Sequence, residues 1–329
     1  MNSSQLSTTL HALVKQKIPT FIWGAPGIGK SSIVKEIAKQ QDIGFIDLRL
    51  ALMDPTDLKG IPFYDKDTST ALWAPPAFLP KNGKGILFLD ELNSAPPSVQ
   101  ASAYQLILDR AVGEYKLPDG WAIISAGNRE GDRGITYRMP APLANRFVHF
   151  ELEVNIQDWR NWAFKNNLDN KIIAYIAYKN EHLFTFDAKS DNKSFATPRS
   201  WEYVDKILKS NLPNELLLNT IAGAISNEVA VSFLSFCKVI DKLPNIQEIL
   251  KDAKGKYPEE MDVLYALSIG LISAVLKENT NLDNVLKYSL NLKGEFSVMI
   301  VQELQRNGLK MEYSSTYKEW VKTFLYLLD

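Results

Sequence analysis

The residues best suited to chemistry lie in one glycine-rich stretch, residues 21–32, with the sequence FIWGAPGIGKSS. The pattern G-x-x-x-x-G-K-[ST] is met there by Gly24, Gly29, Lys30 and Ser31. Glycines let the backbone turn so tightly that successive N–H groups point at one anion, and the positive end of a following helix strengthens this field. The spacing therefore predicts a loop that binds phosphate.

Two side chains of this loop have a predicted task in binding a nucleoside triphosphate. Lys30 is expected to reach the β- and γ-phosphates as a point charge, and the Ser31 hydroxyl to complete the shell of a magnesium ion. The whole predicted nucleotide contact comprises Gly24, Ala25, Pro26, Gly27, Ile28, Gly29, Lys30, Ser31 and Ser32. We expect ATP with Mg²⁺ as the ligand. GTP stays open, although the sequence has no NKxD-like guanine signal.

Apolar residues on both sides of the loop support this interpretation. Residues 20–23 predict a strand, and Ile33, Ile37 and Ala38 follow at helical spacing. An ordinary glycine turn is the alternative, but it does not require a strand before it and a helix after it. A strand that runs through the loop into a helix is the context in which phosphate loops occur.

Carboxylates that could complete such a site end another apolar strand. Residues 85–93, GILFLDELN, read as a parallel strand buried on both faces. Asp90 and Glu91 stand at its carboxyl end, where open α/β sheets bind ligands. We expect Asp90 to hold magnesium through its water shell and Glu91 to polarise the attacking water. The strand predicted over 121–126 leads to Asn128, which is placed to orient water against the γ-phosphate.

Composition describes a globular protein with a net charge of −1, 46% hydrophobic and 23% charged residues. This balance does not favour a nucleic-acid or membrane surface. The N-terminus lacks the pattern of a signal peptide, and the longest apolar stretch, residues 263–276, is too short to cross a bilayer, so we expect a cytoplasmic protein. The single cysteine, Cys237, lies among apolar residues at helical spacing and is interpreted as a small core residue.

The order of the predicted elements indicates an α/β half followed by a helical half. Strands are expected at residues 20–23, 44–50, 85–93, 121–126 and 147–152. Because helical segments separate them, the sheet should be parallel. Helices are expected at residues 5–17, 156–166, 170–178, 200–208 and 215–234, and Ser94 is expected to cap the helix that ends near Asp109.

The segment after the second strand contains many proline, glycine and aspartate residues. It predicts a hairpin inserted into the sheet, with strands at residues 61–64 and 71–73. Phe63 and Trp73 near its tip could form a contact surface or pack back on the body, and the sequence leaves both open. A second small hairpin is expected over 110–120, and residues 132–142 are expected to form a loop.

These motifs together resemble the AAA+ ATPases and, within them, the MoxR-like group. The shared segments are WGAPGIGKS, ILFLDELNSAPPSVQ, SAGN, LANRF and TPRSW, in the order of that family. The resemblance covers about residues 5–208. It implies a nucleotide-binding core at 1–155, made of a five-stranded parallel sheet with helices on both faces and hairpin insertions. A helical lid at 156–250 and a helical C-terminal extension at 251–329 would follow.

The resemblance also implies roles for three polar residues. Asn128 matches sensor 1, and Arg146 in ANRF matches the arginine finger that enters a neighbouring subunit's site. Arg199 in TPRSW matches sensor 2 on the lid. Asn145 stands where many relatives have aspartate. A surface salt bridge for Arg146 and a helix-start charge for Arg199 are the alternatives.

The function that the resemblance implies is ATP hydrolysis by a ring of identical subunits, favoured as a hexamer, which remodels a partner protein in the manner of a chaperone. A protein with a von Willebrand A-type domain is the implied partner. A DNA-acting motor and a nucleotide-dependent scaffold with little hydrolysis remain as alternatives. The first would need basic loops, and the hairpin tip DKDTST offers only Lys66 against two aspartates. The second would not need Glu91.

Overall fold

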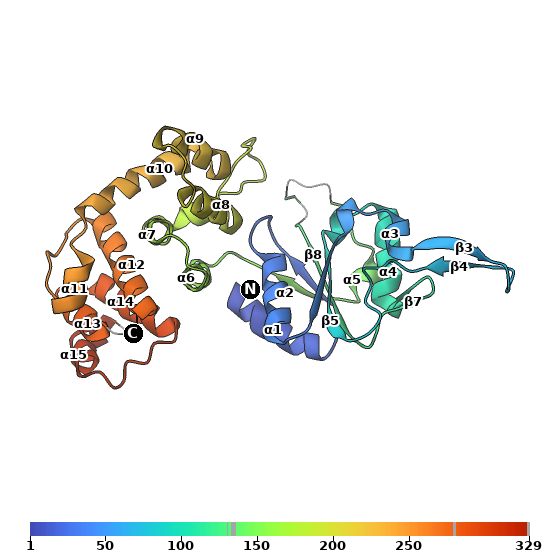
Figure 1. The fold of residues 1–329 in the computed structure, drawn as a ribbon, viewed down its shortest axis with the longest axis horizontal. Coiled ribbons are helices and arrows are strands. Elements are labelled where there is room, and N and C mark those ends of the chain that lie inside the picture. The colour runs from blue at the N-terminus through green and yellow to red at the C-terminus, as the bar shows by residue number, and fades with distance from the viewer. Residues whose placement is uncertain (130, 133–135, 279–280, 328–329) are drawn as a thin grey trace. The chain divides into compact units, whose positions relative to one another are not determined.

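The computed structural model describes residues 1–129, 131–132, 136–278 and 281–327 and divides into two compact units (Figure 1). The first unit is Met1–Asn155 with Asp187–Ser190, and the second is Ile156–Phe186 with Asp191–Asp329. Within the described residues, no helix has the length and apolar character needed to cross a membrane.

The first unit is built on one five-stranded sheet in the order β2-β5-β8-β1-β9. Its strands are β1 (Thr20–Trp23), β2 (Gly44–Arg49), β5 (Lys84–Asp90), β8 (Gly120–Gly127) and β9 (Val148–Glu151). Every neighbouring pair is parallel, which confirms the predicted sheet. The parallel arrangement matters for function because it brings the carboxyl ends of the strands to one edge.

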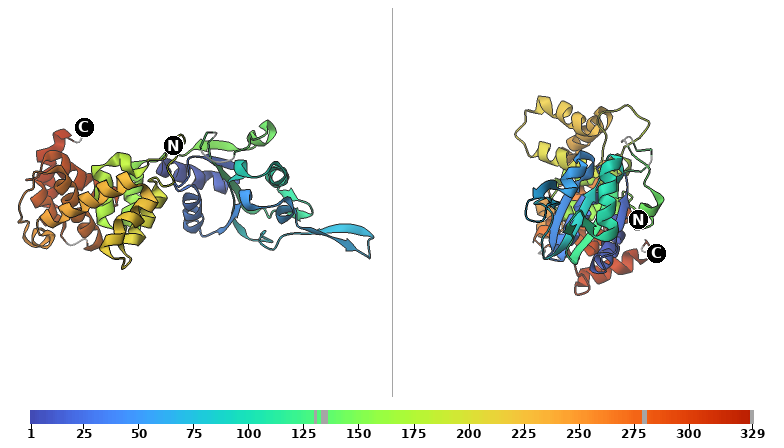
Figure 2. Two further views of the ribbon diagram at one scale, coloured as in Figure 1. Left: turned by 90° about the horizontal axis from the view of Figure 1, so that it is seen from above. Right: turned by 90° about the vertical axis from the view of Figure 1, so that its right-hand side faces the viewer.

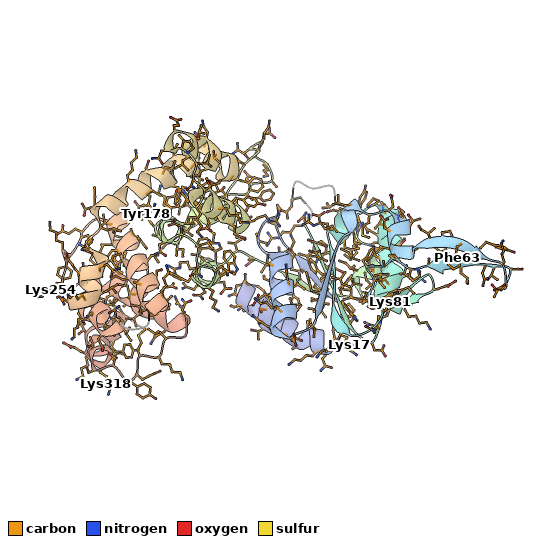
Figure 3. All side chains as sticks on the ribbon, viewed as in Figure 1. Lys17, Phe63, Lys81, Tyr178, Lys254 and Lys318 are labelled. Carbon is orange, nitrogen blue, oxygen red and sulfur yellow. The ribbon has the colours of Figure 1, made fainter. Side chains whose placement is uncertain are left out.

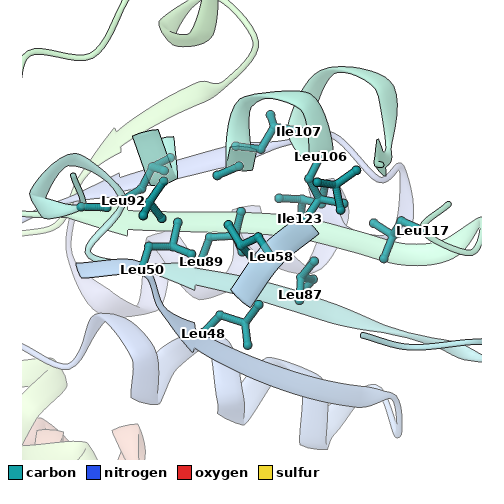
Figure 4. Close-up of a cluster of buried hydrophobic side chains, with 14 of the residues drawn as sticks. Leu48, Leu50, Leu58, Leu87, Leu89, Leu92, Leu106, Ile107, Leu117 and Ile123 are labelled. Atoms are coloured by element: carbon teal, nitrogen blue, oxygen red, sulfur yellow. The ribbon is translucent and has the colours of Figure 1, made fainter. Parts of the chain in front are cut away.

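Helices cover both faces of the sheet, because the buried strands are apolar on both sides. Figure 4 shows one interface, where Leu58 and Leu106 pack with Leu87 and Leu89 of β5. The helices on this face are α3 (Pro55–Lys59) and α4 (Pro97–Asp109). The alternate residues of β5 face the other side, against which α1 (Ser3–Lys15) and α2 (Lys30–Gln40) pack. The sheet is therefore fixed from both faces.

Two hairpins are inserted into this unit, as the sequence predicted. The long one consists of β3 (Ile61–Asp65) and β4 (Thr70–Ala74), which extend away from the sheet of the first unit (Figure 2). The short one consists of β6 (Ala111–Val112) and β7 (Tyr115–Lys116). The two hairpin aromatics named above differ. Phe63, which Figure 3 labels on the long hairpin, is 49% exposed, whereas Trp73 is half-buried.

The described part of the second unit contains helices and connecting loops but no strand. Its α-helices are α6 (Ile156–Lys165), α7 (Asn170–Tyr178), α8 (Pro198–Leu208), α9 (Asn214–Ile225), α10 (Asn227–Cys237), α11 (Ile246–Asp252), α12 (Met261–Glu278), α13 (Leu282–Ser289), α14 (Gly294–Arg306) and α15 (Ser315–Phe324). Helix α12 packs against both α7 and α14. The predicted division of this region at residue 250 stays a prediction.

A buried ion pair joins the first helix of this unit to one of its last. Arg160 on α6 lies 2.8 Å from the carboxylate of Glu303 on α14, and Glu303 has no exposed surface. Burial lowers the pKa of Arg160, and the Glu303 charge opposes that shift. Gln157 donates a further hydrogen bond to the same carboxylate. Arg306 lies 3.7 Å from the same carboxylate but is partly exposed, so Arg160 is the main buried compensation of the Glu303 charge.

Two local predictions were wrong. The helix expected over residues 215–234 is broken at Ser226, whose φ of +81° ends α9 before α10 begins at Asn227. Ser94 does not cap α4, which has Pro96 as its N-cap and begins at Pro97. Consecutive prolines explain this start, because a residue before proline is disfavoured in helical conformation.

Cys237 is only partly buried, and burial raises its pKa to about 12. Its thiol thus stays protonated near neutral pH, which supports the interpretation that it is not a nucleophile. The loop predicted over 132–142 includes residues 133–135, which lie outside the described part of the chain, and its last two residues start α5 (Ala141–Ala144).

The close approach of three strands predicts the effect of one substitution. A Cβ on Gly85 of β5 would lie 2.6 Å from the Trp121 ring and 2.7 Å from the Gly44 carbonyl oxygen. We expect Gly85→Ala to lower the free energy of unfolding by about 2 kcal/mol through overpacking. Urea unfolding followed by circular dichroism measures this change.

Gly223→Ala on α9 is the matched control, because a Cβ there meets nothing within 4 Å. This variant should be more stable by about 0.5 to 1 kcal/mol, as expected for glycine replaced by alanine in a helix. Unchanged stability of Gly85→Ala would mean that the Trp121 ring moves aside without cost.

Candidate functional site

The predicted phosphate loop connects the end of β1 to the start of α2, at the carboxyl edge of the sheet. Gly27 and Gly29 have φ angles of +76° and +96°, a backbone region that glycine enters without strain. Gly29 is the N-cap of α2 and provides no side-chain acceptor, so the first N–H groups of that helix are suited to an outside anion. The local geometry fits the predicted task of the loop.

Lys30, the first residue of α2, turns its side chain back over the loop. Its Nζ donates to the carbonyl oxygens of Gly24, at 2.6 Å, and Ala25, at 3.0 Å. It also donates to Oδ1 of Asn128, at 3.1 Å. Asn128 directly follows β8, the neighbour of β1 in the sheet. The structure therefore brings together two predicted site residues that are 98 positions apart in the sequence.

The predicted carboxylates stand at the end of β5, two strands from β1 and thus about 10 Å away along the sheet edge. Asp90 is half-buried, and its Oδ1 accepts a hydrogen bond from the Glu91 N–H at 2.9 Å. Glu91 has a φ of +57°, in a region that non-glycine residues rarely occupy. Such strained positions occur often at functional sites, where the surrounding structure maintains them.

The turn after Glu91 accounts for how that backbone conformation is held. The Glu91 carbonyl oxygen accepts hydrogen bonds from the N–H groups of Ser94, at 2.9 Å, and Ala95, at 3.1 Å. Leu92 in the same turn is fully buried. These contacts fix the backbone from which the Glu91 carboxylate projects.

Asp47 on β2 is a third carboxylate of this edge that the sequence analysis missed. Its pKa is raised, first by loss of solvation and then by repulsion from Asp90, with a smaller contribution from Glu91. Arg49 and Lys35 act in the opposite direction. Asp47 and Asp90 are thus close enough to repel each other, and a cation bound beside Asp90 would reduce that repulsion. The alternation of polar and apolar residues in β2 does not indicate that Asp47 lies near Asp90.

Asn93 is a second residue that the sequence analysis missed. Its side chain is 2% exposed, and its Nδ2 donates to the Asn128 carbonyl oxygen at 2.8 Å. Its own carbonyl accepts from the Tyr137 N–H at 2.7 Å. Asn93 thus links the turn after Asp90 and Glu91 to the residue that binds Lys30. In the sequence it is only an asparagine two positions after Glu91, a residue type that is common in turns.

The two predicted arginines belong to other elements. Arg146 follows α5 in the first unit, and its side chain is exposed. Arg199 belongs to the second unit, where it is exposed in the first turn of α8. Their contributions to the site stay predictions.

Removal of the Asn93 amide should weaken this part of the structure. Asn93→Ala leaves the half-buried Asn128 carbonyl without that donor, and loss of such a hydrogen bond costs about 0.5 to 1.5 kcal/mol of folding free energy. Urea unfolding measures the loss. Asn145→Ala, at an exposed asparagine of the same unit, is the control and should stay within about 0.5 kcal/mol of the parent. Equal stability of both variants would contradict the structural role of Asn93.

Comparison with known structures finds similar chains at low identity. A provisionally assigned ATPase from Cytophaga hutchinsonii is 14% identical over 98% of this chain and 88% of its own, with a TM-score of 0.38. NtrX from Brucella abortus, in complex with ADP, is 16% identical over 98% of this chain and 68% of its own, with a TM-score of 0.42. RuvB from Thermotoga maritima, a Holliday junction branch migration motor, is 18% identical over 87% and 86%, with a TM-score of 0.39.

Comparison with protein families finds one match within the first unit. Residues 20–149 match the ATPase family associated with various cellular activities (AAA). This span begins at β1 and includes the phosphate loop, both carboxylates after β5, Asn128 and Arg146. The part of the chain that holds the candidate site is therefore similar in sequence to the AAA ATPases.

Proposed function

We propose that this protein binds ATP with Mg²⁺ and hydrolyses it to ADP and phosphate. The observation that carries the proposal is the bond of 3.1 Å between the Lys30 ammonium and the Asn128 side chain. It joins the cation of the phosphate loop to the polar residue at the end of the neighbouring strand. An ATP γ-phosphate bound by Lys30 would therefore lie beside Asn128.

The residues at this edge have the chemistry that phosphoryl transfer needs. Ser31 and Asp90 are hard oxygen donors of the type that Mg²⁺ prefers, and the negative charge around Asp90 favours a cation. A bound Mg²⁺ would neutralise charge on the phosphates. The backbone N–H groups of residues 27–32 would hold the phosphates in place, so that catalysis rests on position and electrostatics.

Glu91 is the proposed general base, and Asn128 the group that orients the water. The carboxylate would polarise a water for in-line attack on the γ-phosphorus, and the proton would pass to the carboxylate. The hydrogen bonds of the turn after Glu91 support this assignment, because a base must keep one position relative to the phosphate. Lys30 would stabilise the charge that develops on the phosphate oxygens.

Arg146 and Arg199 are proposed to complete the site from other parts of the assembly. Arg146 would enter the site of a neighbouring copy, and its exposure is consistent with contact to another chain. Arg199 would act from a lid at 156–250, with 251–329 as an extension. Head-to-tail contacts between copies close into rings, so we propose a hexamer of MoxR type.

The wider role follows from the resemblance alone. We propose a cytoplasmic remodeller of a partner protein, with a von Willebrand A-type domain protein as the partner. The half-exposed Phe63 on the long hairpin supports a surface that contacts protein.

Glu91→Gln tests the proposed base. The variant should bind ATP with the affinity of the parent, because the amide keeps the size of the side chain, but its turnover should fall by at least about 10²-fold. Fluorescent-nucleotide titration and phosphate release measure the two quantities. Glu114→Gln, at an exposed glutamate of the short hairpin, is the control and should match the parent in both. Turnover of Glu91→Gln at the parent rate would remove Glu91 from this role.

The proposed shared site makes turnover depend on protein concentration. Turnover per chain should rise steeply with concentration in the parent and stay low in Arg146→Ala, because an arginine supplied by a neighbour contributes on the order of 10³ to 10⁵ in rate in related reactions. Arg138→Ala, at an exposed arginine of the same unit, should behave as the parent. A rate of Arg146→Ala equal to that of the parent at every concentration would refute a role of Arg146 in a neighbour's site.

A further inference from the structure

His149 on β9 joins the residue before the phosphate loop to the turn that contains Arg146. Its Nδ1 lies 3.0 Å from Nε1 of Trp23, the last residue of β1. Its Nε2 lies 2.8 Å from the carbonyl oxygen of Ala144, the last residue of α5. Trp23 directly precedes Gly24 of the phosphate loop, and Ala144 stands two residues before Arg146.

One tautomer of the imidazole satisfies both contacts. The indole N–H of Trp23 can only donate, so Nδ1 of His149 must accept. The proton then resides on Nε2, which donates to the Ala144 carbonyl, a group that can only accept. The two bonds therefore form one directional chain from Trp23 through His149 to Ala144.

The first member of this chain is held rigidly. Trp23 pairs with Gly127 of β8 on one side and with Glu151 of β9 on the other, and its carbonyl accepts from the Leu152 N–H at 2.8 Å. The rings of Trp23 and His149 are stacked, with an interplanar angle of 21° and centroids 6.1 Å apart. His149 is therefore fixed by packing as well as by its hydrogen bond.

The last member of the chain lies next to the arginine. The Ala144 carbonyl also accepts from the Phe147 N–H at 3.2 Å, which closes the turn that contains Arg146. Phe147 is 7% exposed and anchors the other side of that turn. The Arg146 side chain is exposed, so the position of the arginine depends on this turn. Phe147 packs on Phe21 of β1, and His149 adds the hydrogen bond from a side chain of the sheet to this turn.

We infer that His149 is a positioning residue, which holds Arg146 in the orientation needed to serve the site of a neighbouring copy. This inference rests on the proposed function. It requires His149 only in the chain that supplies the arginine. In the chain that binds the nucleotide, the phosphate loop keeps its own support, because the Gly24 N–H donates to the Gly127 carbonyl and the preceding Trp23 pairs with both neighbouring strands.

A mixing experiment separates these two chains. Glu91→Gln chains supply Arg146 but cannot turn over ATP, and Arg146→Ala chains have a complete base but no arginine to supply. Each variant alone should be nearly inactive, and a mixture should recover turnover. His149→Phe keeps an aromatic ring and deletes both hydrogen bonds.

Placed on the Glu91→Gln chain, His149→Phe should lower the recovered turnover about tenfold, because small displacements of a catalytic group cost this much or more. Placed on the Arg146→Ala chain, it should leave the recovered turnover unchanged. His149→Gln on the Glu91→Gln chain should restore most of the loss, because an amide can accept from Trp23 and donate to Ala144.

The remaining outcomes decide against one proposal or the other. An equal loss from His149→Phe on either chain would show a general structural role and overturn the inference, and so would no loss on either. Absence of recovered turnover in the original mixture would overturn the proposed role of Arg146 and, with it, this inference. Circular dichroism and fluorescent-ADP binding of each His149 variant verify that the chains are folded before mixing.

Discussion

The candidate site depends on the hydrogen bonds that the Lys30 ammonium group donates. A partly buried cation needs acceptors, and Lys30 finds them in two carbonyls of its own loop and in the Asn128 side chain. These bonds hold the loop closed on itself and join it to the neighbouring strand. A bound phosphate would have to compete with these oxygen atoms for the cation.

The order of the strands determines which groups can reach that ammonium. Because β1 lies between β8 and β9, the phosphate loop has Asn128 on one side and the β9 segment with His149 on the other. The carboxylates after β5 stand one strand further away along the same edge of the sheet. The same order gives the two neighbours of β1 different proposed tasks. β8 places Asn128 at the site of its own chain, and β9 supports the exposed Arg146 that would serve a neighbouring copy.

Sequence patterns predicted the parts of the fold that repeat and missed the parts that depend on one contact. The strand Thr20–Trp23 and the helix Asn170–Tyr178 agree with prediction at both ends, because apolar runs and helical spacing define them. The break at Ser226 depends on a single positive φ in a residue that usually avoids it, and no pattern indicates that.

The candidate site divides in the same way. Lys30, Asp90, Glu91 and Asn128 belong to motifs or strand ends, so their positions follow from the topology of the sheet. Asn93, Asp47 and His149 act through contacts across the sheet edge, which become visible only when side chains are placed. Their residue types alone are common in turns and strands and gave no reason to select them.

The carboxylate of Glu303 has a consequence for how related sequences can diverge. With no exposed surface, it needs the Arg160 guanidinium at 2.8 Å, because its other cation, Arg306, lies 3.7 Å away and is itself partly exposed. Removal of Arg160 would leave the carboxylate poorly compensated in that interior. Single changes at either position are therefore disfavoured, while a paired change to apolar residues of similar volume is tolerated. Over evolutionary time the two positions should vary together or not at all. The sequences of the first and of a late helix of the second unit are thus coupled, although the two charged residues are 143 positions apart in the chain.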